Sequence, residues 1–260
     1  MTISMNRGLK NKLEQGKAVV GPFIKAVSPA LIEIIGLSGM DYVLIDLEHS
    51  PVSMEELENL LRAADSGDVC AFVRVAGHNE SDILHPLDKG AGGLLVPMVS
   101  SGESAERIVH FSKFAPQGER GMDIYSRSAK FGYISKAEYL ARANEETLLA
   151  VQIEGTKGIN NLPDILSVEG IDIIYIGPYD LSQSLGIPGK VHDQRVVAKV
   201  EEIVAQAKEK DRFVGIYVDD IETAQRYIAL GVQFITLSVD VTIFAQACDA
   251  LIDKFEKIST

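Results

Sequence analysis

The feature that most constrains the fold is a regular alternation of short apolar runs with helical segments. Eight runs rich in Val, Ile and Leu are separated by segments whose apolar residues recur at helical spacing. Strict β/α alternation predicts a parallel sheet, and eight units predict a closed barrel. We therefore expect one domain, residues 1–260, folded as an α/β (β/α)₈ barrel. The runs begin near Ala18, Tyr42, Cys70, Gly93, Leu148, Ile171, Phe213 and Phe234.

A doubly wound open sheet is the competing fold. It would place a glycine-rich phosphate-binding turn after the first strand. The first strand instead continues as Gly-Pro-Phe-Ile-Lys-Ala-Val from Gly21, which is no such motif. No low-complexity linker divides the chain, so the barrel is the better prediction.

Charge and cysteine content limit the partners and the compartment. The formal net charge of −12 disfavours nucleic acid and anionic membranes as partners, because their phosphates would be repelled. No apolar run approaches the ~18 residues of a membrane-spanning helix, and residues 1–15 contain no signal-like apolar segment. Cys70 and Cys248 lie in apolar runs without a CxxC motif, so we interpret both as buried thiols in a reducing compartment. These observations predict a cytoplasmic location.

Titratable residues gather where the second and third runs end. Asp46, Glu48 and His49 follow one buried strand, and Arg74 ends the next. Active sites of barrels lie at the carboxyl ends of the strands, so these groups should share one mouth. We interpret His49 beside Asp46 as an oriented base and Arg74 as a donor to an oxyanion. A purely structural ion pair between Arg74 and Glu48 is the alternative.

The fifth and sixth runs end in acids that should converge. Glu154 and Asp180 follow neighbouring strands, and two carboxylates with open positions for water suit a hard divalent cation such as Mg²⁺ or Mn²⁺. The alternative for Asp180 is a helix N-cap. The backbone amides of the Gly177–Asp180 turn could hold a small anion beside the metal. Lys25 is the one lysine at a strand end and is interpreted as a surface or interface charge, which disfavours imine chemistry.

Two further segments stand out. The stretch from Phe114 to Tyr133 interrupts the β/α rhythm with several glycines, which is typical of a functional loop. The last helical segment, Val241 to Ile258, carries an apolar stripe wide enough to need a partner surface.

Taken together, six collinear motifs resemble the HpcH/HpaI aldolase family. The resemblance runs from about Gly21 to Asp240 and implies a modified barrel that acts as a class II, metal-dependent pyruvate aldolase. Its substrates would be 4-hydroxy-2-oxo or 2-keto-3-deoxy acids. It also implies a homo-hexamer, a trimer of dimers, in which the last helix is swapped between subunits. The motifs are Ile45-Asp-Leu-Glu-His-Ser-Pro51, Val73-Arg-Val75, Leu95-Val-Pro-Met98, Phe114-Ala-Pro-Gln-Gly-Glu-Arg-Gly121, Val151-Gln-Ile-Glu154 and Ile176-Gly-Pro-Tyr-Asp-Leu-Ser182.

The resemblance also assigns roles residue by residue. It implies that Glu154 and Asp180 hold the metal, which would be Mg²⁺, Mn²⁺ or Co²⁺. It implies catalytic roles for Arg74, for the acid/base residue His49, for the neighbouring Asp46 and for Asp88 as the partner of His49. The residues that it places on the substrate are Gln152, Gly177, Tyr179 and Asp180.

The chain departs from the family where the variable end of the substrate would bind. Met122 follows Arg120-Gly121 where better-known members tend to have small residues, and Phe23 stands where some members have Trp. We therefore expect Phe23 and the loop from Met122 to Phe131 to form the aldehyde pocket.

The main hypothesis is retro-aldol cleavage of a 4-hydroxy-2-oxo acid to pyruvate and an aldehyde. Two alternatives remain open. One is metal-independent condensation, since the same motifs are similar to those of a siderophore-pathway citrate synthase. The other is a catalytically silent barrel subunit, which the presence of His49, Arg74, Glu154 and Asp180 together disfavours.

Overall fold

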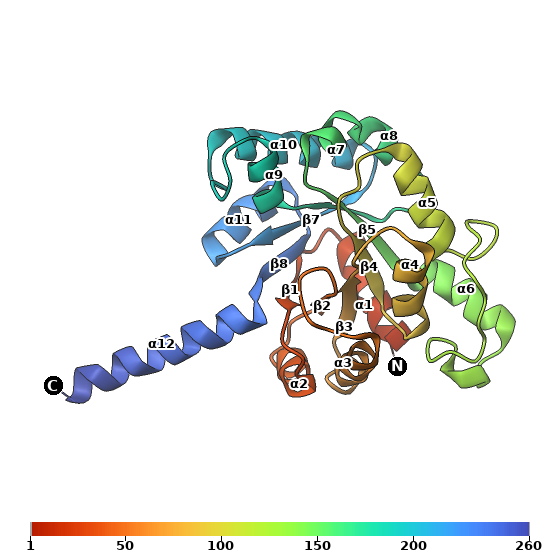
Figure 1. Ribbon diagram of the computed structural model, residues 1–260, viewed down its shortest axis with the longest axis horizontal. Helices are drawn as coiled ribbons and strands as arrows, with labels where there is room; N and C mark the ends of the chain where they lie inside the picture. The colour runs from red at the N-terminus through yellow and green to blue at the C-terminus, as the bar shows by residue number, and fades with distance from the viewer. Residues whose placement is uncertain (1, 260) are drawn as a thin grey trace.

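The structure, a computed structural model, describes residues 2–259 and confirms the predicted α/β barrel. Eight parallel strands follow one another in chain order, and β1 closes the circle by pairing with β8 (Figure 1). The strands are β1 (Val19–Ile24), β2 (Tyr42–Asp46), β3 (Cys70–Arg74), β4 (Gly93–Val96), β5 (Leu148–Ile153), β6 (Ile173–Ile176), β7 (Phe213–Val218) and β8 (Phe234–Val239).

Helices surround the barrel, and the segment after β5 forms two short helices. The first ends at Asn160 and the second begins at Leu162, because Pro163 lacks an N–H and its ring would clash with the preceding turn of a continuous helix. The helices are α1 (Thr2–Glu14), α2 (Pro29–Leu37), α3 (Met54–Ser66), α4 (Glu80–Asp88), α5 (Gly102–Ser112), the 3₁₀ turn η1 (Lys130–Gly132), α6 (Lys136–Glu146), α7 (Thr156–Asn160), α8 (Leu162–Leu166), α9 (Pro178–Ser184), α10 (Gln194–Glu209), α11 (Ile221–Leu230) and α12 (Asp240–Ser259).

Aromatic rings fill the interior of the barrel toward the amino-terminal ends of the strands. The rings of Tyr42 and Phe234 stack with their centroids 4.0 Å apart, and Phe72 lies 4.9 Å from Phe234. Gly93 makes room for this layer, since a Cβ there would lie 2.3 Å from the ring of Phe72. Helix α1 closes the amino-terminal end of the barrel: Asn6 donates to the carbonyl of Gly92, just before β4. The interior is thus sealed at one end, and the carboxyl ends of the strands form the open one.

Local sequence signals fix the loop that follows β2. Ser53 caps α3 by accepting from the Glu56 N–H at 3.2 Å, and the Glu56 carboxylate accepts from the Ser53 N–H at 2.7 Å. This capping box sets where α3 begins. It therefore limits the length of the loop that carries the polar residues after β2.

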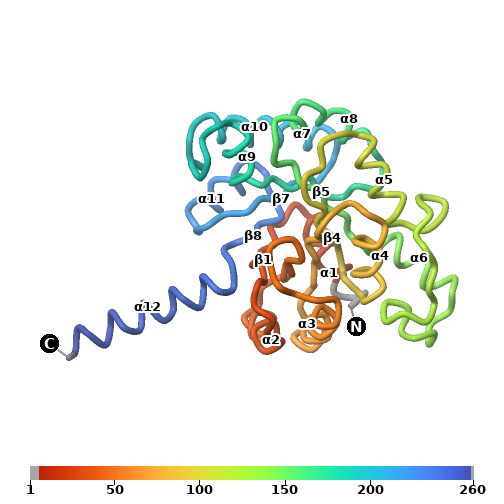
Figure 2. Tube along the Cα trace, viewed as in Figure 1, coloured from red at the N-terminus to blue at the C-terminus, as the bar shows by residue number. Residues whose placement is uncertain are grey.

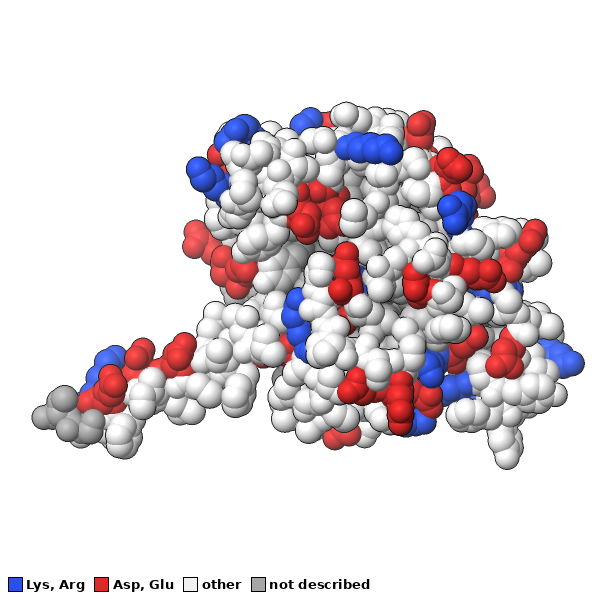
Figure 3. Space-filling model, in the orientation of Figure 1, with Lys and Arg blue, Asp and Glu red and all other residues white. Residues whose placement is uncertain are grey.

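Helix α12 leaves the end of β8 and projects away from the barrel (Figures 1 and 2). Within the chain it packs mainly against β1 and β8, and Phe244, Leu251 and Phe255 are each at least 60% exposed. Figure 3 shows uncharged side chains covering the part of α12 nearest the barrel. Cys248 lies on this helix and is exposed, so the prediction that it is buried is wrong, whereas Cys70 is buried. Within residues 2–259 no helix is both long and apolar enough to cross a bilayer.

Candidate active site

A buried ion pair joins the ends of β2 and β3. Asp46 and Arg74 are the last residues of their strands and lie side by side in the sheet. The Nε and Nη2 atoms of Arg74 each donate to the Asp46 carboxylate at 2.8 Å. Burial alone raises the pKa of Asp46, but the hydrogen bonds and charge of Arg74, helped by Lys25, hold the pKa below its ordinary value. Asp46 is therefore ionised and fixes the guanidinium group at the barrel mouth.

The loop after Asp46 is organised by the same carboxylate. Its Oδ1 accepts from the backbone N–H of Glu48 at 3.1 Å and, at 3.3 Å, from that of His49. The exposed His49 ring contacts Glu48, with 3.8 Å between Nε2 and Oε2, and Nη1 of Arg74 lies 3.2 Å from Glu48. Asp46 thus positions His49 through the backbone N–H of that residue. The structural pair of Arg74 with Glu48 also forms, and Arg74 uses both acids.

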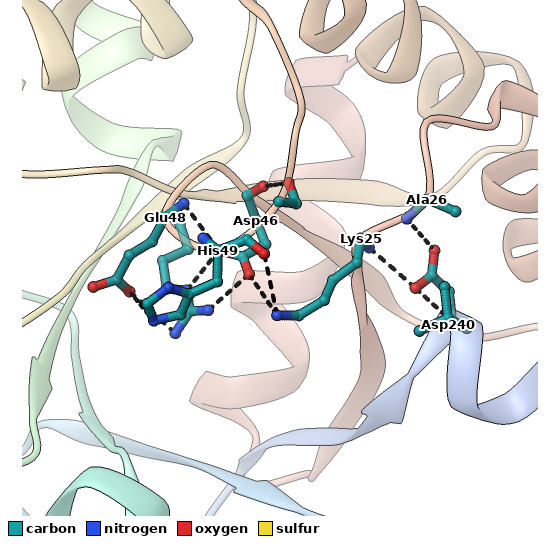
Figure 4. Close-up of polar contacts among 9 residues, drawn as sticks. Lys25, Ala26, Asp46, Glu48, His49 and Asp240 are labelled. Atoms are coloured by element: carbon teal, nitrogen blue, oxygen red, sulfur yellow. Dashed lines mark hydrogen bonds and ion pairs between the residues drawn. The ribbon is translucent and has the colours of Figure 1, made fainter.

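Lys25 belongs to this cluster, although its sequence position predicted a surface or interface charge. Its Nζ lies 3.3 Å from Asp46 (Figure 4). Asp240, the first residue of α12, accepts from the backbone N–H groups of Lys25 at 3.0 Å and Ala26 at 2.9 Å. The first residue of α12 therefore fixes the backbone just after β1, and this places Lys25 at the mouth.

A second acidic group lies across the mouth, where β5 and β6 end. The Glu154 carboxylate accepts from the Met98 N–H at 2.7 Å and from Nε2 of Gln152 at 2.5 Å. Met98 has a φ of +54°, and this unusual backbone conformation aims its N–H at Glu154. Burial, and then the charge of Asp180, raise the pKa of Glu154 to about 7. Asp180 lies inside α9, whose N-cap is Gly177, so it does not cap that helix.

Two adjoining hollows connect these groups. The first, which we call the mouth hollow, has a volume of about 250 Å³, and the second, the carboxylate cavity, about 370 Å³; His49 and Asp180 line both. The mouth hollow is lined by Phe23, Lys25, His49, Arg74, Gln152, Tyr175, Gly177, Pro178, Tyr179, Asp180, Tyr217 and Val239. The carboxylate cavity is lined by Glu48, His49, Met98, Val99, Ser100, Glu154, Gly155, Lys157, Gly158, Asp180, Gln183 and Ser184.

One wall of the mouth hollow is aromatic. The guanidinium of Arg74 lies 4.6 Å from the centroid of the Phe23 ring, and Phe23 lies 5.9 Å from the ring of Tyr217. The hydroxyls of Tyr179 and Tyr217 both donate to Asp219 at 2.8 Å. Asp219 therefore fixes both tyrosine side chains at the rim.

The donor set of the carboxylate cavity fits a divalent cation. Glu154 and Asp180 face the same space, and a cation between them would remove the repulsion that helps to raise the pKa of Glu154. Among residues 2–259 no group of three or more His, Cys, Asp or Glu side chains is placed to hold a metal. A cation here would rely on two carboxylates, with water and substrate oxygens completing its shell, as Mg²⁺ commonly does.

Two predicted site segments lie away from the mouth. Asp88 accepts from Arg120 at 2.8 Å and lines a separate hollow with His85 and Arg127, so within one chain it is not a partner of His49. The loop from Met122 to Phe131 contributes to that hollow and to a neighbouring one, but not to the mouth hollow. The topology explains both results, because α4 and α5 return the chain to the amino-terminal end of the barrel. Phe23, by contrast, lies in the mouth hollow as expected.

Tyr175 and Lys25 are among the residues of the mouth hollow that sequence reasoning did not assign to the site. Tyr175 lies in the middle of an apolar strand, and Lys25 follows one. The available signal was period-2 alternation: Tyr175 is two residues before Gly177, and Lys25 is two residues after Phe23, so each shares an inward face with a predicted site residue.

Comparisons with known proteins agree on one family. The family model described as HpcH/HpaI aldolase/citrate lyase matches residues 20–247. The 4-hydroxy-2-oxo-heptane-1,7-dioate aldolase of Escherichia coli is 33% identical over 252 residues, which cover 96% of this chain and 95% of that protein. The 2-keto-3-deoxy-L-rhamnonate aldolase of Salmonella gallinarum is 32% identical over 261 residues, covering 100% and 97%.

Solved structures with the same fold include an aldolase and a citrate synthase. The HpcH/HpaI aldolase from Desulfitobacterium hafniense gives a TM-score of 0.90 at 29% identity, covering 95% of this chain and 96% of that one. Citrate synthase SbnG gives a TM-score of 0.88 at 33% identity, covering 97% and 99%. The fold is therefore shared with a protein named as an aldolase and with one named as a citrate synthase.

Proposed function

Because the chain belongs to the HpcH/HpaI aldolase/citrate lyase family, we propose that it is a divalent-metal-dependent aldolase. The reaction would be the reversible cleavage of a 4-hydroxy-2-oxo acid or a 2-keto-3-deoxy acid to pyruvate and an aldehyde. The observation that carries the proposal is that Glu154 and Asp180 face one cavity, which adjoins a hollow lined by Arg74 and His49. Mg²⁺, Mn²⁺ and Co²⁺ all suit such a site.

The residues of the mouth divide the chemistry among them. A divalent cation held by Glu154 and Asp180 would supply Lewis acidity toward the keto and carboxylate oxygens of the substrate. Arg74, immobilised by Asp46, donates to the oxygen on which negative charge develops. His49 removes the proton of the 4-hydroxyl as the C3–C4 bond breaks, and the bonding electron pair passes into the enolate of pyruvate. Protonation at C3 then completes pyruvate, and the aldehyde leaves.

The substrate-binding roles of Gln152, Gly177 and Tyr179 remain part of the proposal. Gln152 and the first turn of α9 line the mouth hollow beside Asp180. Backbone N–H groups at this turn would hold the substrate carboxylate, and Phe23 would contact the aldehyde end.

The direct test is a panel of 4-hydroxy-2-oxo and 2-keto-3-deoxy acids, assayed for pyruvate with added Mg²⁺, Mn²⁺ or Co²⁺ and again with EDTA. We expect pyruvate release that EDTA abolishes and metal restores. If no substrate yields pyruvate and the C3 protons of pyruvate do not exchange with solvent, the aldolase proposal is wrong.

The similarity to citrate synthase SbnG favours one second candidate, a metal-independent condensing enzyme. In that reaction Glu154 would act as a general acid or base, for which a pKa of about 7 is suitable. Metal analysis of chelator-treated protein, paired with the activity assay, separates the two candidates. Condensation that survives complete metal removal would favour the second.

For the assembly, we propose a homo-oligomer in which α12 docks on a neighbouring subunit, as in a hexamer built as a trimer of dimers. The exposed apolar stripe of α12 supports this, because a stripe of that size is unfavourable in water. Removing residues 241–260 should dissociate or unfold the protein, as measured by light scattering. Phe255→Asp is the milder variant and should weaken assembly without disturbing the barrel. A full-length protein that remains a folded monomer at micromolar concentration would contradict the proposal.

The partner would be a small-molecule oxo acid, and we expect neither nucleic acid nor membrane to bind. The free thiols of Cys70 and Cys248 support a reducing, cytoplasmic compartment.

A further inference from the structure

The floor of the mouth hollow contains a buried phenol that the proposed chemistry has not used. Tyr175 is 1% exposed, and its hydroxyl has no hydrogen-bond partner among the residues that the structure describes. The neighbouring Thr236 hydroxyl acts on the pKa of Tyr175 as a weak hydrogen-bonding neighbour and lowers it. It does not complete a hydrogen bond of normal geometry with the phenol, and its well-formed bond, at 2.8 Å, is to Tyr42. An unpaired buried hydroxyl destabilises a fold, so its retention needs a reason.

The barrel holds the Tyr175 ring in place. Gly215 lies beside it in the sheet, and a Cβ there would come within 2.8 Å of the ring. The ring also meets Phe234 edge to face, with 6.4 Å between the centroids. A glycine on one side and an aromatic ring on the other leave the phenol a defined position inside the barrel. Its hydroxyl is thus directed by packing and not by an internal hydrogen bond.

A second unpaired polar atom lies on the neighbouring strand. Gln152 pairs with Tyr175 in the sheet, is 2% exposed, and leaves its Oε1 without a partner. Its amide nitrogen donates to Glu154 at 2.5 Å, which leaves Oε1 turned away from that side chain. Both residues line the mouth hollow with Arg74, so its floor presents polar atoms that a ligand can satisfy.

We propose that Tyr175 is a substrate-binding residue whose hydroxyl donates a hydrogen bond to an oxygen of the oxo acid held beside Arg74. Burial raises the pKa of Tyr175, so the phenol stays protonated and can donate throughout the neutral range. The residue would add an uncharged donor to the charged donor Arg74. This inference rests on the proposed function, because it takes the oxo acid as the ligand of the mouth hollow.

The test is Tyr175→Phe, which removes only the hydroxyl, with Tyr42→Phe as the matched control. Tyr42 is also fully buried in the barrel, but its hydroxyl is satisfied by Thr236 and it does not line the mouth hollow. We would measure exchange of the pyruvate C3 protons in the presence of Mg²⁺ or Mn²⁺. The second readout is the shift in Tm that pyruvate causes in each protein.

For Tyr175→Phe we expect kcat/KM to fall by about tenfold or more, mainly through KM, and the pyruvate-induced shift in Tm to shrink. The Tm of the ligand-free variant should be unchanged or higher, because an unpaired buried hydroxyl has been removed. Tyr42→Phe should do the opposite, lowering the Tm while leaving kcat/KM within about twofold of the original protein.

Two results overturn the inference, and they differ from a failure of the proposed function. If the original protein exchanges the protons and Tyr175→Phe matches it in kcat/KM, Tyr175 does not bind the substrate. If Tyr175→Phe lowers the Tm and leaves KM unchanged, the hydroxyl is structural. An original protein that neither exchanges the protons nor gains stability from pyruvate would overturn the aldolase proposal, and this inference with it.

Discussion

The two sides of the barrel mouth treat buried charge in opposite ways. Where β2 and β3 end, the positive charges of Arg74 and Lys25 balance the negative charge of Asp46, and Arg74 also pairs with Glu48. Where β5 and β6 end, Glu154 lies close to Asp180, and the described residues form no ion pair with either carboxylate. The first side lowers the pKa of its buried acid, and the second raises it.

The contrast separates a scaffold from a binding surface. A balanced cluster gains nothing from a ligand's charge, and it holds Arg74 and the His49 loop in one geometry before substrate arrives. The unbalanced side carries like charges near each other and two unpaired polar atoms, on Gln152 and Tyr175. Such features are unfavourable in the free protein and become favourable when a cation and an oxygen-rich ligand bind.

The strongest test of the balanced side is Arg74→Ala. Loss of the donor should reduce turnover by at least about 10²–10³-fold. The variant also leaves Asp46 buried and charged with only Lys25 beside it, so we expect the free energy of unfolding to fall by about 3–5 kcal/mol. Denaturant unfolding and the pyruvate assay measure the two effects.

The control for that test is the double variant Asp46→Asn/Arg74→Ala. Removing both charges should restore much of the stability without restoring turnover. If Arg74→Ala is as stable as the original protein, Asp46 is not held by this pair, and the description of a balanced side is wrong.

The unbalanced side predicts a gain in stability when Glu154 becomes Gln. Its pKa of about 7 in the fold exceeds the ordinary value of 4.5, so the folded metal-free protein holds a proton that the unfolded chain releases. Stability is therefore lost as pH rises from about 4.5 to 7, by about 3 kcal/mol at most. At pH 8 the unfolding free energy of the metal-free Glu154→Gln protein should exceed that of the original protein by about 2 kcal/mol, because the loss of one hydrogen bond offsets part of the gain. At pH 4 the variant should gain nothing.

Added Mg²⁺ or Mn²⁺ should reverse this order at pH 8. The cation stabilises the original protein through the two carboxylates and has little effect on the variant, which retains only Asp180. Thermal unfolding with and without metal provides the comparison. A variant that gains as much from metal as the original protein would remove Glu154 from the metal site.

The balanced and unbalanced sides were predictable to different extents. The barrel follows from local periodicity, and parallel strands bring their carboxyl ends to one mouth, so Asp46, Arg74, Glu154 and Asp180 could be placed together from sequence. Whether each charge is paired depends on side-chain reach. Lys25 illustrates this, because its long chain returns from the end of β1 to Asp46, a contact that no sequence pattern indicates.

Asp88 and the Met122–Phe131 loop lie away from the mouth of their own chain for a topological reason, and Tyr175 was overlooked for a chemical one. Asp88 ends α4 and the loop follows α5, and both helices return the chain to the closed end of the barrel, a position that the predicted β/α order already implied. Tyr175 was overlooked because its neighbours are apolar, and an unpaired hydroxyl becomes visible only when every surrounding atom is placed.

A smaller effect is expected from Gly177→Ala, which disturbs only the unbalanced side. A Cβ at this position would lie 2.7 Å from Nε2 of Gln152 and 2.9 Å from the Glu154 carboxylate, so the pair must separate. We expect a loss of about 1–3 kcal/mol in unfolding free energy and weaker metal binding. Gly8→Ala adds the same methyl group inside α1 with nothing within 4 Å, and should stabilise the protein by up to about 1 kcal/mol. Equal effects of the two variants would contradict the tight packing of Gln152 against Glu154.

The smallest effect should come from Lys25→Met, although Lys25 lines the mouth hollow. Asp46 keeps both hydrogen bonds from Arg74 in this variant, and Lys25 is about one-third exposed, so the unfolding free energy should fall by less than about 1 kcal/mol.

The same lysine is the one strand-end group that could form an imine with pyruvate. That reaction needs a neutral amine, which burial or cationic neighbours favour, whereas Lys25 is partly exposed and lies 3.3 Å from a carboxylate. Borohydride reduction in the presence of pyruvate should therefore leave Lys25 unmodified, as seen by intact-mass measurement, and Lys25→Met should keep its activity within about tenfold. A reduced pyruvate adduct on Lys25, absent from the variant, would assign catalysis to the balanced side and contradict the division of roles across the mouth.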